Sequence, residues 1–345
     1  MYYPLFDWLR IILASIVLLS HDGVLQWHYA GDLAVQVFFA LSGWLIGGIL
    51  LSSKKEDLPR FFFNRVTRIW VPYAIAIGLL LCASLLRDPV TPKWLEFVFY
   101  KVTFVYNLFG STQRAQSQDL MPLEGTGNHF WSICAEEQFY LFAPVVLLLL
   151  PARFGKSIIL WAMLSLLAIK FNFYASIALG VSAAVIKERF FDWHLGKAPI
   201  LILFFVIILL AVVMYFQKAY YFFVAPWFAI STILLLARPG KKTTWGQFWG
   251  GVSYPFYLNH WIGIFVAHEL LEPFGLREAD VSKVMAFLVN ILVASILYIV
   301  VDRTMLRDRR AWFNERRGKS AAIAAYSLLI IGLAGGGFLL ISPIS

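Results

Sequence analysis

The sequence predicts an all-α polytopic membrane protein, a bundle of about 10–11 transmembrane helices. Of its 345 residues, 60% are hydrophobic and only 14% are charged, whereas soluble domains carry roughly a quarter charged residues. A soluble globule of this length could not bury so much apolar surface and still present a charged exterior. Composition therefore excludes a soluble enzyme, a disordered chain and a fibrous repeat.

Apolar stretches that approach or span a bilayer of about 30 Å recur along the whole chain. They lie at residues 5–21, 33–52, 69–86, 133–151, 157–171, 173–187, 198–216, 219–237, 251–271, 283–302 and 321–342. The aromatic segment Trp94–Phe109 is shorter and carries Glu96 and Lys101, which favours an interfacial or re-entrant helix. It belongs to the one long loop between spans, at residues 87–132.

The basic residues favour one orientation of these spans. With a cytoplasmic N-terminus, the inner loops hold 20 of the 29 Lys and Arg residues, including the basic segment 303–319. This agrees with the positive-inside rule. The net charge of +9 is then a topology signal rather than a sign of nucleic-acid binding. The two cysteines have no metal-ligand spacing, and we expect no metal site.

The first span carries ionisable residues, which are costly in a membrane unless they are paired or hydrated. Asp7 lies three residues before Arg10, close enough to pair with it. Eleven helical steps separate Arg10 from His21, which places the two side chains within about 20° on one face and roughly 16 Å apart. A snorkelling arginine and an interfacial histidine remain the alternative explanation.

Three further segments carry candidate site residues. The fourth span opens with the adjacent carboxylates Glu136 and Glu137, which point about 100° apart, so at most one faces the bundle centre squarely. Helix N-terminal acids stabilised by the helix dipole are the alternative there. The ninth span places Ser253, Tyr257 and His260 on related faces, which polar packing between helices could also explain. Before the third span, Arg65 and Arg68 share a helical face that could hold phosphates, or could simply be positive-inside charge.

Together these segments resemble the membrane acyltransferase 3 family, which acylates carbohydrates across bacterial membranes. The resemblance covers most of the chain and rests on five motifs in order: Asp7-x-x-Arg10-x10-His21, Phe38-Phe39-Ala40-Leu41-Ser42-Gly43, Arg65-x-x-Arg68, Trp131-Ser132 to Glu136-Glu137-Gln138-Phe139-Tyr140-Leu141, and Ser253-Tyr254-Pro255-Phe256-Tyr257-Leu258-x-His260. The chain is similar to the stand-alone form without an appended extracellular domain. It departs from the family in having Trp8 after Asp7, and Ile133-Cys134-Ala135 after Ser132.

The resemblance implies a domain at residues 1–302, followed at 303–345 by a basic cytoplasmic linker and an extra transmembrane helix. It implies a multi-pass protein of the bacterial inner membrane that moves an acyl group, with acetyl the expected one, from cytoplasmic acyl-CoA to a cell-envelope carbohydrate or lipid-linked saccharide. No cofactor is expected to be tightly bound, because acyl-CoA is a donor substrate. The acceptor sugar and the oligomeric state are open.

The residues suggest roles in that reaction. His21 would be the general base, with Glu136 or Glu137 orienting its ring. Arg10, Arg65, Arg68, Ser253, Tyr257 and His260 would bind the donor. Direct transfer and a route through an acylated His21 both remain open. The competing hypothesis is a proton-coupled transporter or exporter that uses Arg10, His21 and Glu137 as a relay.

Overall fold

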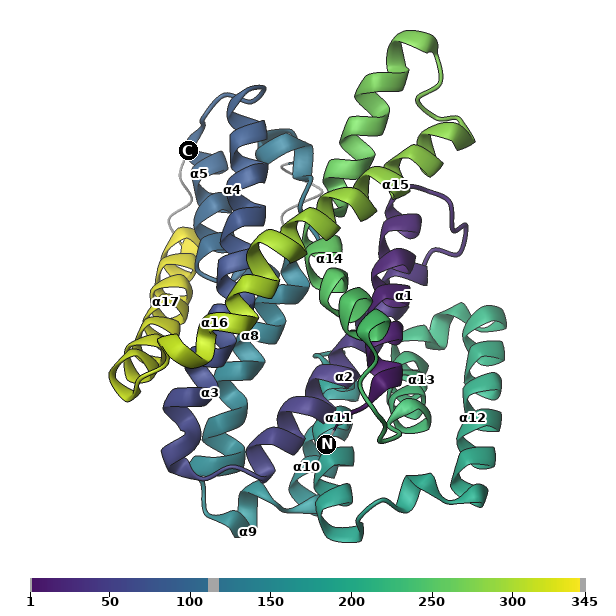
Figure 1. The fold of residues 1–345 in the computed structure, drawn as a ribbon, viewed down its shortest axis with the longest axis vertical. Coiled ribbons are helices and arrows are strands. Elements are labelled where there is room, and N and C mark those ends of the chain that lie inside the picture. Colours follow the sequence, from purple (N-terminus) through teal and green to yellow (C-terminus); the bar gives the residue numbers. More distant parts are fainter. Residues whose placement is uncertain (1, 111–117, 342–345) are drawn as a thin grey trace.

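The computed structural model describes residues 2–110 and 118–341, and these form helices and turns without a strand. Residues 111–117 of the predicted outer loop, and residues 342–345 at the end of the predicted C-terminal segment, lie outside the described residues. The all-α fold class predicted from the sequence is confirmed. Figure 1 shows the bundle, with α12 at one edge and α17 at the opposite edge.

All eleven apolar stretches coincide with helices. The helices are α1 (Pro4–His21), α2 (Ala30–Leu51), α3 (Leu58–Arg65), α4 (Val71–Leu85), α5 (Pro92–Val102), α6 (Tyr106–Phe109), α8 (Phe130–Pro144), α9 (Ala152–Gly155), α10 (Ile158–Lys170), α11 (Ala175–Phe190), α12 (Lys197–Phe216), α13 (Tyr221–Leu236), α14 (Thr244–Leu271), α15 (Asp280–Leu297), α16 (Arg303–Trp312) and α17 (Glu315–Ile341). Three π-helical turns extend them: η2 (Val66–Trp70), η6 (Val145–Leu149) and η10 (Tyr298–Asp302). Short 3-10 turns include η4 (Gln118–Leu120) and η5 (Pro122–Gly125).

Eight helices within the described residues are long and apolar enough to cross a membrane. The other three predicted spans coincide with α10 and α11, which have 13 and 16 residues, and with α14, which is long but less apolar. Only 11% of the apolar stretch of α12 is buried within the protein, so lipid is the solvent for most of its surface. The segment expected to be interfacial forms α5, whose 11 residues are too short to span a bilayer.

The centre of the bundle is built on α1, α2 and α14. Helix α1 packs against both α2 and α14, and α2 also packs against α11 and α13. Glycines make the α2–α11 crossing close, because a Cβ on Gly180 would lie 2.3 Å from the Ala40 carbonyl oxygen. Small residues at such crossings are typical of membrane helices. This packing brings the N-terminal motif beside a helix more than 200 residues away in sequence.

Helices α15, α16 and α17 pack against the outside of this central group and against α3 and η2. Helix α17 packs against α3, with Gly318 against the Pro59 backbone, and the hydroxyl of Tyr326 donates to the carbonyl oxygen of Leu141 on α8. Helix α16 contacts η2. The basic segment that was expected to be a linker is therefore helical and lies against the part of the chain that carries Arg68.

Candidate active site

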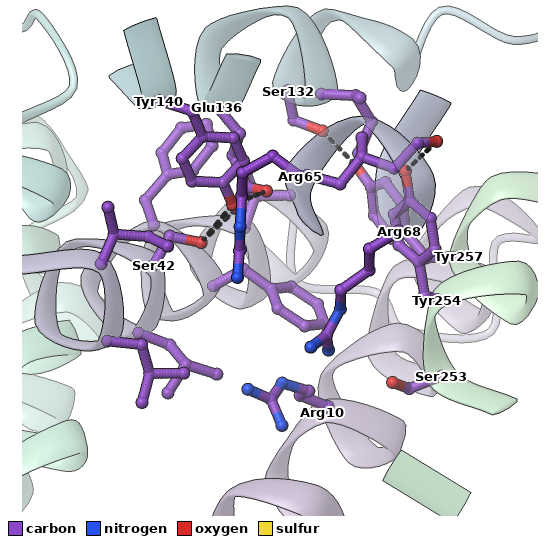
Figure 2. Close-up of a pocket in the computed structure, with 18 of the residues that line it drawn as sticks. Arg10, Ser42, Arg65, Arg68, Ser132, Glu136, Tyr140, Ser253, Tyr254 and Tyr257 are labelled. Atoms are coloured by element: carbon purple, nitrogen blue, oxygen red, sulfur yellow. Dashed lines mark hydrogen bonds between the residues drawn. The ribbon is translucent and has the colours of Figure 1, made fainter. Parts of the chain in front are cut away.

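A cavity of about 200 Å³ lies among α1, α2, α8, η2 and α14, and we call it the basic pocket. Figure 2 shows the guanidinium groups of Arg10, Arg65 and Arg68 reaching into the same space from three different segments. The other polar side chains lining it are Ser42, Ser132, Glu136, Tyr140, Ser253, Tyr254 and Tyr257. The structure therefore brings together Arg10, Arg65 and Arg68, three of the residues expected to bind the donor.

The positive charge of the basic pocket is only partly balanced. Arg10 pairs with Asp7 at 3.3 Å between Nη1 and Oδ1. No ion pair forms on Arg65 or Arg68 within the part of the chain that the structure describes, and Nε of Arg65 is buried there without a hydrogen-bond partner. Arg65 instead lies over the ring of Tyr140, with its Cζ 5.5 Å from the centroid. Such guanidinium groups are suited to bind a phosphorylated ligand.

Arg65 and Arg68 face one cavity, as their spacing of three residues on a helix predicts. Arg65 is the last residue of α3 and Arg68 lies in the π-helical turn η2. A π-helical turn widens the helix locally, and such turns often occur at functional sites. Trp70, the last residue of the turn, links it to α8, because its indole Nε1 donates to Oε2 of Glu137 at 2.8 Å.

The two adjacent carboxylates have separate surroundings. Glu136 lines the basic pocket and accepts hydrogen bonds from the hydroxyls of Ser42, at 2.6 Å, and Tyr140, at 2.9 Å. Glu137 is 4% exposed and is bonded to Trp70, while its Oε1 has no hydrogen-bond partner among the described residues. We expected one of them to orient His21. The hydrogen bonds described for both carboxylates go to other residues instead, and His21 is bonded to another histidine.

A second, larger cavity of about 690 Å³ contains His21, and we call it the histidine cavity. Three histidine rings from three segments meet there: His21 at the end of α1, His129 before α8, and His260 in α14. The His129 and His260 ring centroids are 4.3 Å apart, and those of His21 and His260 are 4.9 Å apart. His21 is exposed to the cavity, whereas the other two rings are buried.

Hydrogen bonds in this cluster determine which nitrogen of each ring carries a proton. His260 Nδ1 lies 2.8 Å from the Tyr257 carbonyl oxygen, which can only accept, so Nδ1 donates. In the neutral ring Nε2 is then an acceptor, and it lies 2.8 Å from Nδ1 of His21. His21 therefore donates from Nδ1 and carries its lone pair on Nε2. This is the tautomer that a general base in the histidine cavity requires.

His260 lies in a different cavity from most of the other residues that were expected to bind the donor. It does not line the basic pocket with Arg10, Arg65 and Arg68, but supports His21 in the histidine cavity. Ser253 does line the basic pocket, where its hydroxyl donates to the Gly250 carbonyl oxygen. The three residues predicted on related faces of one helix therefore divide between two cavities: Ser253 lines the basic pocket, His260 the histidine cavity and Tyr257 both.

Tyr257 lies where the two cavities meet. Tyr257 and Val35 line both cavities. The Tyr257 hydroxyl is 2.6 Å from Oγ of Ser132, and its ring packs edge-on against Phe38. A ligand that extends through the basic pocket would reach this junction, and with it the edge of the histidine cavity.

Sequence reasoning missed His129 and Asp32. His129 stands two residues before the Trp131-Ser132 motif, and its Nε2 donates to the Leu258 carbonyl oxygen at 3.1 Å. Burial, and then His260 and His21, hold the pKa of His129 well below its ordinary value. Asp32 lines the histidine cavity and accepts from the Tyr221 hydroxyl at 2.6 Å. Ionisable residues are scarce in this chain, so the presence of a histidine and an aspartate in or beside apolar segments was a signal that the sequence offered.

Among the side chains described, no group of three His, Cys, Asp or Glu could hold a metal ion.

Comparison with known proteins identifies the family. A family model described as an acyltransferase domain (Acyl_transf_3) matches residues 3–301. The chain belongs to this acyltransferase family. The match includes all five motifs and every residue that lines either cavity.

Curated relatives agree with this membership. The O-acetyltransferase OatA of Staphylococcus aureus (strain NCTC 8325 / PS 47) is 30% identical over 158 residues, which are 44% of this acyltransferase and 26% of the relative. A putative O-acetyltransferase of S. aureus strain COL is 29% identical over 173 residues, 46% of this chain and 28% of the relative. The chain thus matches about a quarter of the length of these relatives. No solved structure matches it.

Proposed function

We propose that this acyltransferase moves an acetyl group from acetyl-CoA to a hydroxyl of a cell-envelope carbohydrate. The observation that carries the proposal is the junction of two chemically different cavities at Tyr257 and Val35. One cavity is lined by three guanidinium groups and the other by a histidine base. The acetyl group is favoured because the curated relatives are named as O-acetyltransferases.

The basic pocket suits a long anionic donor. Arg65 and Arg68 would bind the phosphates of CoA, and the pantetheine arm would extend past Arg10 towards Tyr257. Positive loop charge favours a cytoplasmic location for this end of the molecule, which is also where acyl-CoA is made available. The N-terminus is then cytoplasmic, and the histidine cavity faces the outer side of the inner membrane.

The histidine cavity suits a hydrophilic acceptor. Carboxylates and guanidinium groups line it together with aromatic rings: Asp32, Arg87, Asp88, Trp131, Trp261, Phe265, Glu269 and Arg277. Its volume of about 690 Å³ falls within the range of small-ligand sites, roughly 300–1,000 Å³. Polar groups that hydrogen-bond hydroxyls, beside rings that pack on a sugar face, favour a saccharide acceptor.

The proposed reaction uses His21 as general base. Its Nε2 takes the proton of the acceptor hydroxyl while the hydroxyl oxygen attacks the thioester carbonyl carbon. The tetrahedral intermediate collapses, the carbon–sulfur bond breaks, and the CoA thiolate receives the proton from His21. Arg10 lies in the basic pocket on the same helix, where its charge stabilises negative charge on the donor side.

The test is the His21→Ala variant, reconstituted in lipid and compared with His28→Ala as a matched control. His28 is an exposed histidine in the loop after α1 and lines neither cavity. We expect His21→Ala to fold and bind acetyl-CoA but to lose acetyl transfer, by about 100-fold or more, while His28→Ala remains active. Transfer retained by His21→Ala would contradict the catalytic assignment.

Two other outcomes separate the alternatives. Protein-bound acetyl label formed without acceptor would indicate the route through an acylated His21, whereas direct attack predicts none. Transport of a solute without consumption of acetyl-CoA would contradict the acyltransferase proposal and favour the transporter.

A further inference from the structure

A small cleft continues from the basic pocket on the far side of Arg68. It is lined by Thr67, Arg68, Asp302, Met305, Leu306 and Arg309, and its volume is about 10 Å³. A space of that size holds about one water molecule. Arg68 lines both the cleft and the basic pocket, so the two spaces are adjacent.

The cleft contains a buried acceptor that is not satisfied. Asp302 is 7% exposed, and its Oδ2 has no hydrogen-bond partner among the described residues. A buried polar group without a hydrogen bond lowers the free energy of unfolding, so such a group in a folded protein requires an explanation. A single hydroxyl group fits the cleft and would donate to this oxygen.

The same cleft has positive charge available for an anion. Arg309 is half-buried and, across residues 2–110 and 118–341, forms no ion pair. The charges of Arg68, Arg310 and Arg60 repel the Arg309 guanidinium. Two guanidinium groups and one carboxylate line the cleft, so a further anion would reduce the repulsion between the arginines. An anion bound here would lie beside the donor phosphates proposed for Arg65 and Arg68.

Two π-helical turns and one helix position the polar groups of the cleft. Asp302 ends the π-helical turn η10 and Arg68 lies in the π-helical turn η2, while α16, which carries Arg309, packs against η2. The family match ends at residue 301. Asp302 and Arg309 therefore line the cleft beside the basic pocket from a segment outside the matched residues.

We propose that this cleft takes the free 2′-hydroxyl of the phosphorylated ribose of the acyl-CoA donor, while the rest of the ribose stays at its mouth. Asp302 accepts a hydrogen bond from the free 2′-hydroxyl of the ribose, and Arg309 binds the neighbouring 3′-phosphate. A phosphate alone would fit less well, because the Asp302 carboxylate repels it and would still lack a donor. A hydroxyl beside a phosphate satisfies both groups at once. This inference depends on the proposed acyl-CoA function.

The test is equilibrium binding to the full chain in lipid nanodiscs, with acetyl-CoA and acetyl-3′-dephospho-CoA as probes. We expect the wild type to prefer acetyl-CoA by about tenfold, as for a charge-assisted hydrogen bond. Arg309→Ala should lose that preference by weakening acetyl-CoA binding alone. Arg310→Ala is the matched control, because it removes the same charge from α16 at an exposed position outside the cleft.

Asp302 is tested with the 2′-deoxy analogue of acetyl-CoA. The wild type should bind this analogue several-fold more weakly than acetyl-CoA, and Asp302→Ala should bind the two equally. Equal binding of all three probes by the wild type would overturn the ribose subsite and leave the proposed function intact. Equal weakening of acetyl-CoA and its dephospho form in Arg309→Ala would also overturn it. Failure of the wild type to bind any probe would overturn the proposed function itself.

Discussion

Replacement of His260 by alanine tests whether the histidine pair positions the base. In the structure His21 Nδ1 donates to His260 Nε2, and His260 Nδ1 donates to a backbone carbonyl that cannot change role. Without the His260 ring, the His21 ring can rotate or adopt the other tautomer, which moves its lone pair away from the acceptor hydroxyl. The rate of transfer should fall while donor binding stays the same.

The size of the effect follows from the burial of the bond. His260 is 2% exposed, and loss of one partner of a buried hydrogen bond costs about 1–3 kcal/mol. If this cost appears in the transition state, kcat falls by about 5- to 150-fold. Water that fills the space left by the ring would move the loss towards the lower figure. KM for acetyl-CoA should change by less than about twofold, because His260 does not line the basic pocket.

The assay is steady-state acetyl transfer by His260→Ala, His260→Gln and the control Asn259→Ala. Glutamine supplies an amide oxygen that can accept from His21, so His260→Gln should recover part of the rate. Asn259 is also buried in α14, but its side chain donates to the Pro255 carbonyl oxygen within the helix and lines neither cavity. A wild-type kcat in His260→Ala would refute the positioning role. Equal losses in all three variants would show a packing effect instead.

Three further predictions follow from the cavities and the packing. Combined Arg65→Ala and Arg68→Ala should weaken acetyl-CoA binding by at least about tenfold, measured by titration calorimetry, and unchanged binding would contradict the donor site. Gly180→Ala should lower the thermal midpoint, by an overpacking cost of about 1–3 kcal/mol, whereas Gly48→Ala has open space around its Cβ and should not. Because the pKa of His129 is lowered on folding, the unfolded chain binds more protons below about pH 6.5. Thermal stability should therefore fall with decreasing pH through that range, and fall less in His129→Gln.

Much of the fold could be predicted because the hydropathy of each stretch of sequence depends only on its own residues. All eleven apolar stretches became helices, since lipid leaves the backbone no better way to satisfy its hydrogen bonds. The relation of Arg10 to His21 was also predictable, because both lie on one continuous helix, and the structure places them in the two adjoining cavities.

The partners of the site residues depend on packing between distant helices, and local periodicity carries no information on that. His21 and His260 are 239 positions apart and meet only because α1 packs against α14. The separate surroundings of Glu136 and Glu137 depend in the same way on Ser42 in α2 and Trp70 in η2. Asp302 lies in a π-helical turn that departs from regular helical spacing, so a helical wheel could not place it.

The central claim is that donor and acceptor occupy opposite cavities that meet at Tyr257. Proteoliposomes of known orientation test it most directly, with a saccharide acceptor sealed inside or outside and labelled acetyl-CoA added to one side. We predict acetylated product only when acetyl-CoA is on the side of Arg65 and Arg68 and the acceptor is on the side of His21. Product formed only when both substrates share one side would contradict the account.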